Sequence, residues 1–359
     1  MLIQIGRFRF GTQLFKQCLF YSTAKFDEFH AEKCIVQPDD NLPSRAEECI
    51  VQPDDNLPSH AEGTKFLKVA ILGLPNTGKS TLINALVQRP ICPTSSKAHT
   101  TTYKANAIYS EGDTQIVFMD TPGFASKNEM IKFELSKAFK KDPVTSIIDA
   151  DIIGVLQDAT NVYTRHTMTR YMVNDLNKRK ENTPVILIFN KVDKLTNKKI
   201  LLELVTQLQK NKYIPKFDDI FMISALTGDG VDDLRNYLLD SAKKNKWQYE
   251  QNLYTDQSPE SIVKQTVRAK LLDLLPTDMP YVTEVDVQHY DVSKDGTVTC
   301  VVLLKCPRKH IKNTLVKNRG EKLRLIAVVI ERELRHAFKT NVFVRLIALT
   351  FSKEQNCYL

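Results

Sequence analysis

The segment from Gly73 to Ser80 has the residue types and the spacing of a loop that binds phosphate. It matches the pattern G-x-x-x-x-G-K-[ST], directly after an apolar run and directly before a helical pattern. Glycines let backbone N–H groups turn towards phosphate oxygens, the lysine adds a point charge, and the serine hydroxyl can bind Mg²⁺. A chance match in a chain this long has a probability on the order of 1%. The residues predicted to bind the nucleotide here are Gly73, Asn76, Thr77, Gly78, Lys79, Ser80 and Thr81, with Lys79 also catalytic and Ser80 also a metal ligand.

A second motif, Asp120-Thr121-Pro122-Gly123, follows the third predicted strand. A carboxylate at this place can reach the Mg²⁺ ion through water, and the Gly123 N–H can contact the γ-phosphate. Asp and Gly are common in turns, so the motif gains its weight from its position after the phosphate loop. We predict Asp120 as a metal-binding and catalytic residue and Gly123 as a catalytic one.

The identity of the base is predicted from Asn190-Lys191-Val192-Asp193, after the fifth predicted strand. An aspartate carboxylate accepts the N1–H and N2–H donors of guanine, whereas adenine has no such pair and leaves the carboxylate unpaired. Ser224-Ala225-Leu226, after the sixth predicted strand, provides backbone N–H groups for the guanine O6. The order of the four motifs favours GTP and GDP over the alternative, an ATP-binding P-loop protein. The predicted nucleotide-binding residues of these two motifs are Asn190, Lys191, Asp193, Ser224 and Ala225.

The stretch from Thr94 to Tyr103 is rich in serine and threonine and lies between the first two motifs. One threonine hydroxyl in such a segment completes the Mg²⁺ shell when the γ-phosphate is present. We predict Thr101 as this metal-binding and catalytic residue, with Thr100 as the alternative. His99 is nearby, but a solvated loop histidine is a better interpretation than a general base.

Phe124 follows Gly123, where some GTPases carry a glutamine that orients the attacking water. An apolar side chain cannot orient water, so we expect slow hydrolysis that needs a partner or a monovalent cation such as K⁺. Asn76 could offer an oxygen to that cation. The alternative is that Asn76 only stabilises its loop, and both interpretations stay open.

The elements that position these motifs show the pattern of an α/β domain, a mostly parallel sheet with helices on both faces. Six short apolar runs are predicted as strands, and they cover residues 66–72, 105–109, 115–119, 152–156, 185–189 and 220–223. The short turn at 111–113 makes the second and third strands an antiparallel hairpin, and the other connections are long enough for parallel strands. A helix over residues 231–244 closes this P-loop GTPase domain, which we assign to residues 65–246.

A second, α+β unit is predicted for residues 247–359. Residues 258–275 have a helical apolar period and begin with the capping signal Ser258-Pro259. Two strand patterns flank a turn at 291–296, a basic helix-turn-helix covers 308–338, and a last strand covers 341–349. The order is therefore helix, strand, strand, helix, helix, strand.

Basic residues of this unit cluster around the turn Lys317-Asn318-Arg319-Gly320. Residues 305–324 contain eight lysines and arginines and one acidic residue, Glu321. A charge run is usually a solvated face, but this turn falls where a KH domain places the G-x-x-G loop that clamps a nucleic-acid backbone. The residues predicted to bind RNA are Lys309, Lys312, Lys317, Asn318, Arg319, Gly320, Lys322 and Arg324.

Length and composition agree with two folded domains, because 359 residues divide into units of roughly 100–200. The net charge of +8 favours an acidic partner such as RNA. The seven cysteines show no C-x-x-C spacing and are predicted to be free thiols in a reducing compartment.

Residues 1–26 contain four basic and no acidic residues, which is typical of a mitochondrial transit peptide. A basic N-terminus of a cytosolic protein is the alternative. Residues 27–64 hold a tandem repeat, 34–44 and 49–59, with enough Pro, Asp and Asn to predict a disordered linker.

The combination of the four nucleotide motifs with a KH-like unit resembles the Era family of ribosome-associated GTPases, from about residue 66 onwards. The resemblance implies a type II KH domain that binds small-subunit ribosomal RNA near its 3′ end. It also implies assistance to small-subunit assembly under the control of GTP. With the N-terminal segment it implies a monomer in the mitochondrial matrix, and it leaves open a peripheral contact with the matrix face of the inner membrane.

One departure from the family pattern keeps a second function open. Lys317 replaces the first glycine of the clamp, where a side chain obstructs the close approach of an RNA backbone. The alternative is a GTP-gated scaffold whose altered KH unit docks on protein. A tRNA-modification GTPase is disfavoured, because Cys357 belongs to no catalytic cysteine motif.

Overall fold

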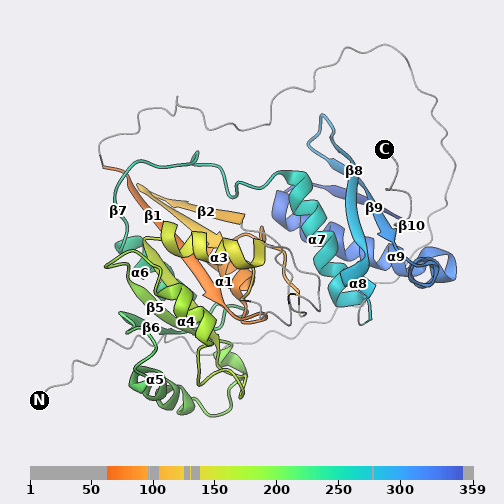
Figure 1. Cartoon of the computed structure of the whole chain (residues 1–359). Helices are drawn as coiled ribbons and strands as arrows, with labels where there is room; N and C mark the ends of the chain where they lie inside the picture. The colour runs from red at the N-terminus through yellow and green to blue at the C-terminus, as the bar shows by residue number, and fades with distance from the viewer. Residues whose placement is uncertain are drawn as a thin grey trace, which may run out of the picture. The chain divides into compact units, whose positions relative to one another are not determined.

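The computed structural model describes residues 63–95, 97, 105–124, 130, 138–276 and 279–350. These residues form two sheets, one of seven strands and one of three (Figure 1). The predicted transit peptide and the linker up to residue 62 lie outside the described residues, so these assignments stay predictions. Among the described residues, none of the helices is long and apolar enough to cross a membrane.

The first sheet confirms the six predicted strands and their directions. Its strands are β1 (Lys65–Gly73), β2 (Ala105–Glu111), β3 (Thr114–Asp120), β4 (Ile152–Asp158), β5 (Val185–Asn190) and β6 (Asp219–Met222), in the order β2-β3-β1-β4-β5-β6. Strands β2 and β3 pair antiparallel, and the pairs β1–β3, β1–β4, β4–β5 and β5–β6 are parallel. All the carboxyl ends of the parallel strands therefore meet at one edge, where a ligand site is expected.

A seventh strand corrects the prediction of a six-stranded sheet. The helix predicted for 231–244 ends early, as α6 (Val231–Asp240), and β7 (Lys243–Lys244) pairs antiparallel with the start of β1. Both lysines are exposed, so they show no apolar period that would mark them as part of the sheet. Backbone hydrogen bonds alone make this strand, and such bonds leave no side-chain pattern in a sequence.

Helices cover both faces of the first sheet. On one face, α1 (Lys79–Val87) and α6 share a core with β1. On the other face, α3 (Ala138–Asp149), α4 (Arg170–Leu176) and α5 (Ile200–Lys210) pack around the opposite side chains of the same strands. Because both faces are covered, β4 and β5 are buried along their whole length, as their apolar sequences predict.

The second sheet has helices beside its three strands, and these strands fall where the sequence predicts them, while the short helix α8 was not predicted. The elements are α7 (Pro259–Leu274), α8 (Met279–Val282), β8 (Glu284–Val292), β9 (Val298–Cys306), α9 (Lys309–Phe338) and β10 (Val342–Thr350). The Ser258 side chain caps α7 by accepting a 3.3 Å hydrogen bond from Ser261 N–H, as its sequence predicts. Strand β9 lies in the middle, antiparallel to β8 and parallel to β10. Residues of α7, α9 and all three strands share one apolar core.

The basic helix-turn-helix predicted for 308–338 is one helical element, α9, and this corrects the prediction of two helices. The backbone nonetheless departs from helical geometry at the predicted turn, because Gly320 has a φ of +81°. A right-handed helix has φ near −63°, so a glycine is needed at this point. The residues on both sides of Gly320 are helical, so the two halves form one continuous element.

Candidate nucleotide site

The phosphate loop connects the end of β1 with the first residue of α1. Gly78 precedes α1 with a φ of +98°, and a Cβ atom there would lie 2.4 Å from the side-chain nitrogen of Asn190. Only glycine fits both the backbone angle and this close approach. The loop therefore directs its backbone N–H groups and the start of α1 towards the same space, which suits an anion.

Lys79 holds the loop in its curled shape. Its Nζ donates to the carbonyl oxygens of Leu74 (2.9 Å) and Gly73 (3.3 Å). Burial lowers the pKa of Lys79 to about 8, and the nearby Asp120 carboxylate offsets only part of this effect. A buried ammonium group with only carbonyl partners gains further stabilisation from phosphate oxygens.

Ser80 and Asp120 meet at the start of α1 and the end of β3. The Ser80 hydroxyl donates a 3.0 Å hydrogen bond to Asp120 Oδ2, and Asp120 is buried. Gly123 returns alongside the phosphate loop, since a Cβ atom there would lie 3.0 Å from Lys79 Nζ and from the Pro75 nitrogen. The second motif thus lies against the first, as its sequence position predicts.

Asn190 joins the phosphate loop to the loop after β6. Its Nδ2 donates to the Thr77 carbonyl oxygen (2.8 Å), and its Oδ1 accepts from Ala225 N–H (2.9 Å). The side chain is almost completely buried. One asparagine therefore sets the distance between the part of the site that faces phosphate and the part that faces the base.

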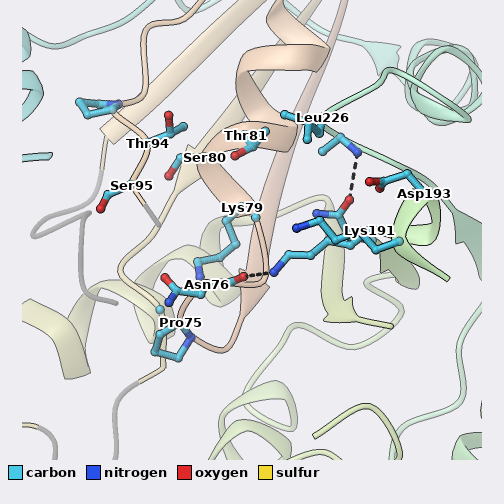
Figure 2. A pocket seen from close by; sticks show the side chains of 16 residues that line it. Pro75, Asn76, Lys79, Ser80, Thr81, Thr94, Ser95, Lys191, Asp193 and Leu226 are labelled. Carbon is cyan, nitrogen blue, oxygen red and sulfur yellow. Dashed lines mark hydrogen bonds between the residues drawn. The ribbon is translucent and has the colours of Figure 1, made fainter. Parts of the chain in front are cut away.

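Lys191 crosses the site on its exposed side. Its Nζ donates to the Asn76 carbonyl oxygen and to Asp158 Oδ2, both at 2.6 Å. The residue has a φ of +66°, which begins the short 3₁₀ helix η1 (Val192–Lys194) and places the exposed Asp193 carboxylate beside the pocket (Figure 2). The pairing of Lys191 with Asp158 is absent from the sequence predictions.

Two of the three backbone N–H groups of the Ser224-Ala225-Leu226 turn already donate to other residues of the protein. Ser224 N–H donates to Asp229 O, and Ala225 N–H donates to Asn190. Leu226 N–H makes no hydrogen bond to another described residue, and Leu226 lines the pocket with 75% of its surface exposed. In this geometry Leu226 N–H, rather than Ala225 N–H, is available to a ligand.

These loops enclose a cavity of about 410 Å³, a volume typical of small-ligand sites (Figure 2). The predicted residues that line it are Asn76, Gly78, Lys79, Ser80, Thr81, Gly123, Asn190, Lys191, Asp193 and Ala225. Gly73, Thr77, Asp120 and Ser224 do not line the cavity, and all four are buried. The other lining residues are Pro75 and Leu226, which lie within the predicted motifs, and Pro93, Thr94, Ser95 and Lys194, which lie outside them. The richness of 94–103 in hydroxyl groups was the signal for Thr94 and Ser95.

The predicted switch threonine and Phe124 differ in whether the structure describes them. Thr101, its alternative Thr100 and His99 lie outside the described residues, so their roles stay predictions. Phe124 is buried and packs against Tyr171, with 6.0 Å between ring centroids. Its side chain belongs to the core and does not line the pocket.

The predicted RNA-binding residues lie on α9, on both sides of Gly320. Lys309, Lys317 and Arg324 are exposed, and Lys312, Gly320 and Lys322 are partly exposed. The structure describes no side-chain position for Asn318 or Arg319. A surface hollow is lined by Thr314, Lys317, Glu321, Lys322 and Leu325. Lys305 of the basic run pairs instead with Asp286 (2.9 Å) and Glu284 (3.8 Å), so the cluster carries less free positive charge than the sequence indicates.

A phosphate loop joined by one asparagine to a guanine-type loop, at the carboxyl edge of a parallel sheet, defines a P-loop GTPase. The family described as "50S ribosome-binding GTPase" matches residues 68–191. The mitochondrial GTPase Era of Danio rerio is 31% identical over 337 residues, covering 79% of this chain and 75% of that protein. GTPase Era of Brucella melitensis is 31% identical over 275 residues, covering 76% and 84%. The chain belongs to the Era family of GTPases, and it is an enzyme that hydrolyses GTP.

Solved structures extend the similarity to both sheets. Era in complex with MgGDPNP and nucleotides 1506–1542 of 16S ribosomal RNA has 26% identity and a TM-score of 0.69, covering 81% of this chain and 95% of that one. A variant of Aquifex aeolicus Era bound to GDP·AlF4⁻ has 26% identity and a TM-score of 0.70 over the same shares. The three-stranded sheet therefore corresponds to the expected KH-type domain.

Proposed function

We propose that this protein is a GTP-dependent assembly factor of the mitochondrial small ribosomal subunit, which binds small-subunit ribosomal RNA through its C-terminal domain. The observation that carries the proposal is the single pocket in which Asn190 joins the phosphate loop to the guanine loop. The relative solved with a 16S ribosomal RNA fragment supports the RNA, and the names of two fish relatives support the mitochondrial location.

In this proposal the pocket binds GTP with each group in a separate role. Lys79 contacts the β- and γ-phosphate oxygens, and Gly123 N–H detects the γ-phosphate. The exposed carboxylate of Asp193 reads the two guanine donors, and Leu226 N–H is the donor for guanine O6. Asn190 contacts no reacting atom; it holds these two regions at a constant separation.

The residues beside the phosphates fit a Mg²⁺ ion. Ser80 and Asp120 bring a hydroxyl and a carboxylate within 3.0 Å of each other, and Mg²⁺ prefers such oxygen ligands. We propose Ser80 and Thr101 as direct ligands and Asp120 as a ligand through water. The ion would neutralise negative charge on the phosphates, while Asp120 orients the ion's shell and Lys79 aligns the γ-phosphate.

Hydrolysis by the chain alone is proposed to be slow. No described side chain that lines the pocket replaces the water-orienting glutamine, since Phe124 points into the core. We propose K⁺ as an activator, bound in part by the Asn76 side chain. The Asn76 carbonyl oxygen accepts a hydrogen bond from Lys191.

The RNA site is proposed on α9 around Gly320, where Lys309, Lys317 and Arg324 are exposed. Exposed ammonium and guanidinium groups contact phosphates, and a glycine turn lets a backbone approach closely. A second candidate function is docking on a protein, because Leu325 (63% exposed) and Val328 (61% exposed) form an apolar strip on the same helix. Membrane contact and the monomeric state stay predictions.

A pair of charge-reversal variants separates the two functions. Lys317→Glu with Arg319→Glu should weaken binding of the full chain to a 3′ fragment of small-subunit ribosomal RNA by at least about tenfold, with a smaller salt dependence. The matched control is Lys212→Glu with Lys216→Glu, which makes the same charge change on exposed residues before β6. Equal effects would indicate non-specific attraction, and no effect of either would favour docking on protein. Import of the full chain into isolated mitochondria tests the location.

A further inference from the structure

Asp158 is the last residue of β4 and lies directly beside the guanine-type loop. In the parallel pairing of β4 with β5, Asp158 is in register with Asn190, and Ala159 N–H donates to Asn190 O at 3.1 Å. Only 11% of the Asp158 side chain is exposed. A carboxylate so nearly buried needs charged or hydrogen-bonding partners, because burial without them costs several kcal/mol.

Both oxygens of this carboxylate are held. Oδ1 accepts from the Thr160 backbone N–H (2.9 Å) and from the Thr160 hydroxyl (2.6 Å). Oδ2 accepts from Lys191 Nζ at 2.6 Å. Burial alone would raise the pKa of Asp158, but the hydrogen bonds from Lys191 and Thr160 outweigh it and lower the pKa. The carboxylate is therefore ionised at neutral pH and is oriented before any ligand arrives.

Lys191 depends on this carboxylate for its conformation. Its φ of +66° is unfavourable for a residue with a side chain. The ammonium group is held at two points, Asp158 Oδ2 and the Asn76 carbonyl oxygen, and these two bonds compensate for the backbone strain. The same backbone angle starts η1 and so determines where Asp193 lies.

We propose that Asp158 is a positioning residue for guanine-nucleotide recognition, acting through Lys191. It contacts no ligand itself; it holds Lys191 across the phosphate loop and in the backbone angle that directs Asp193 into the pocket. This inference rests on the proposed guanine site.

Loss of the carboxylate has a defined consequence. The Lys191 ammonium group then keeps only its bond to the Asn76 carbonyl oxygen, so Lys191 and the Asp193 turn that follows it are held less firmly against the phosphate loop. The affinity of the protein for GDP and its affinity for GTP should fall equally, because the same lining residues contact both nucleotides. KM for GTP should therefore rise while kcat at saturation is unchanged.

The test uses Asp158→Asn in the full chain and measures release of fluorescently labelled GDP. Asparagine keeps an acceptor for Thr160 but turns an NH₂ group towards the lysine. We expect release to be about tenfold faster. The matched control is Asp175→Asn on α4, whose carboxylate also pairs with a lysine (Lys178, 2.5 Å), and it should leave release unchanged.

A double-variant comparison tests whether the effect passes through Lys191. Lys191→Met should speed GDP release by itself, and adding Asp158→Asn should change it no further. Additive effects, or a lowered melting temperature with normal release from Asp158→Asn, would show a merely structural role and overturn the inference. Failure of the unmodified chain to bind GDP would overturn the proposed guanine site and the inference with it.

Discussion

Replacing Asn190 by alanine tests the central feature of the pocket. The change removes two hydrogen bonds, to Thr77 O and from Ala225 N–H, in a nearly fully buried position. Each backbone group left unpaired costs about 1–3 kcal/mol, so the free energy of unfolding should fall by about 2–6 kcal/mol. At about 2–4 °C per kcal/mol for a domain of this size, the melting temperature should fall by about 4–24 °C. GDP release should also become at least about tenfold faster.

The single tryptophan provides the assay. Trp247 Nε1 donates to the carbonyl oxygens of Lys65 and Asp113 at 3.1 Å, so its fluorescence reports on the first sheet rather than on the second. Thermal unfolding of nucleotide-free protein and release of labelled GDP are measured on the same sample. The two measurements separate lost stability from lost alignment of the loops.

Asn106→Ala is the matched control for this experiment. Asn106 Nδ2 bonds Asp256 Oδ2 (2.7 Å) and the Tyr249 hydroxyl (3.2 Å), and Asn106 does not line the pocket. The control should lose stability without faster GDP release. If Asn190→Ala instead kept wild-type release, or if the control released GDP equally fast, the reasoning that Asn190 aligns the two loops would be refuted.

Three further predictions concern neighbouring positions. Gly78→Ala should reduce GDP affinity more than a hundredfold in calorimetry, because its φ of +98° and the 2.4 Å approach of Asn190 exclude a methyl group. Burial lowers the pKa of Lys79 from 10.5 to about 8, so between these pH values the unfolded chain binds the proton more tightly than the folded one. Urea titrations should therefore show the nucleotide-free protein gaining stability as pH rises from about 8 to 10, and Lys79→Met should remove that gain. Phe124→Gln should lower the melting temperature, since it buries an amide beside Tyr171, and single-turnover assays should show no faster hydrolysis.

Much of the first domain could be predicted because its strands and motifs are each marked by residues that lie next to one another in the sequence. Strands such as β4 and β5 are buried on both faces and so consist of continuous apolar residues. Gly78 and Gly320 both have the positive φ that their motifs require. The phosphate loop, the Asp120 motif and the Asn190 motif each follow a strand end, so the parallel topology brings them together at one edge.

Other features could not be predicted, because they depend on which residues become neighbours. Strand β7 consists of two exposed lysines and leaves no apolar pattern. Lys305 counts as a basic residue in the sequence, yet strand pairing places Asp286 and Glu284 beside it. The turn after β6 was predicted to offer its backbone N–H groups to the base, but two of them are bonded within the protein, Ser224 N–H to Asp229 and Ala225 N–H to Asn190.

The sequence by itself determined the class of protein, the identity of the base and the order of the six main strands of the first sheet, because motif chemistry and apolar periodicity are carried by neighbouring residues. Only the tertiary structure decided which hydrogen-bonding groups of the pocket are already paired within the protein and which are available to a ligand. Register between β4 and β5 places Asp158 beside Lys191, 33 residues apart, and the buried Asn190 side chain links loops that are 113 and 35 residues away. Such contacts arise from strand pairing and burial, and a linear pattern does not encode them.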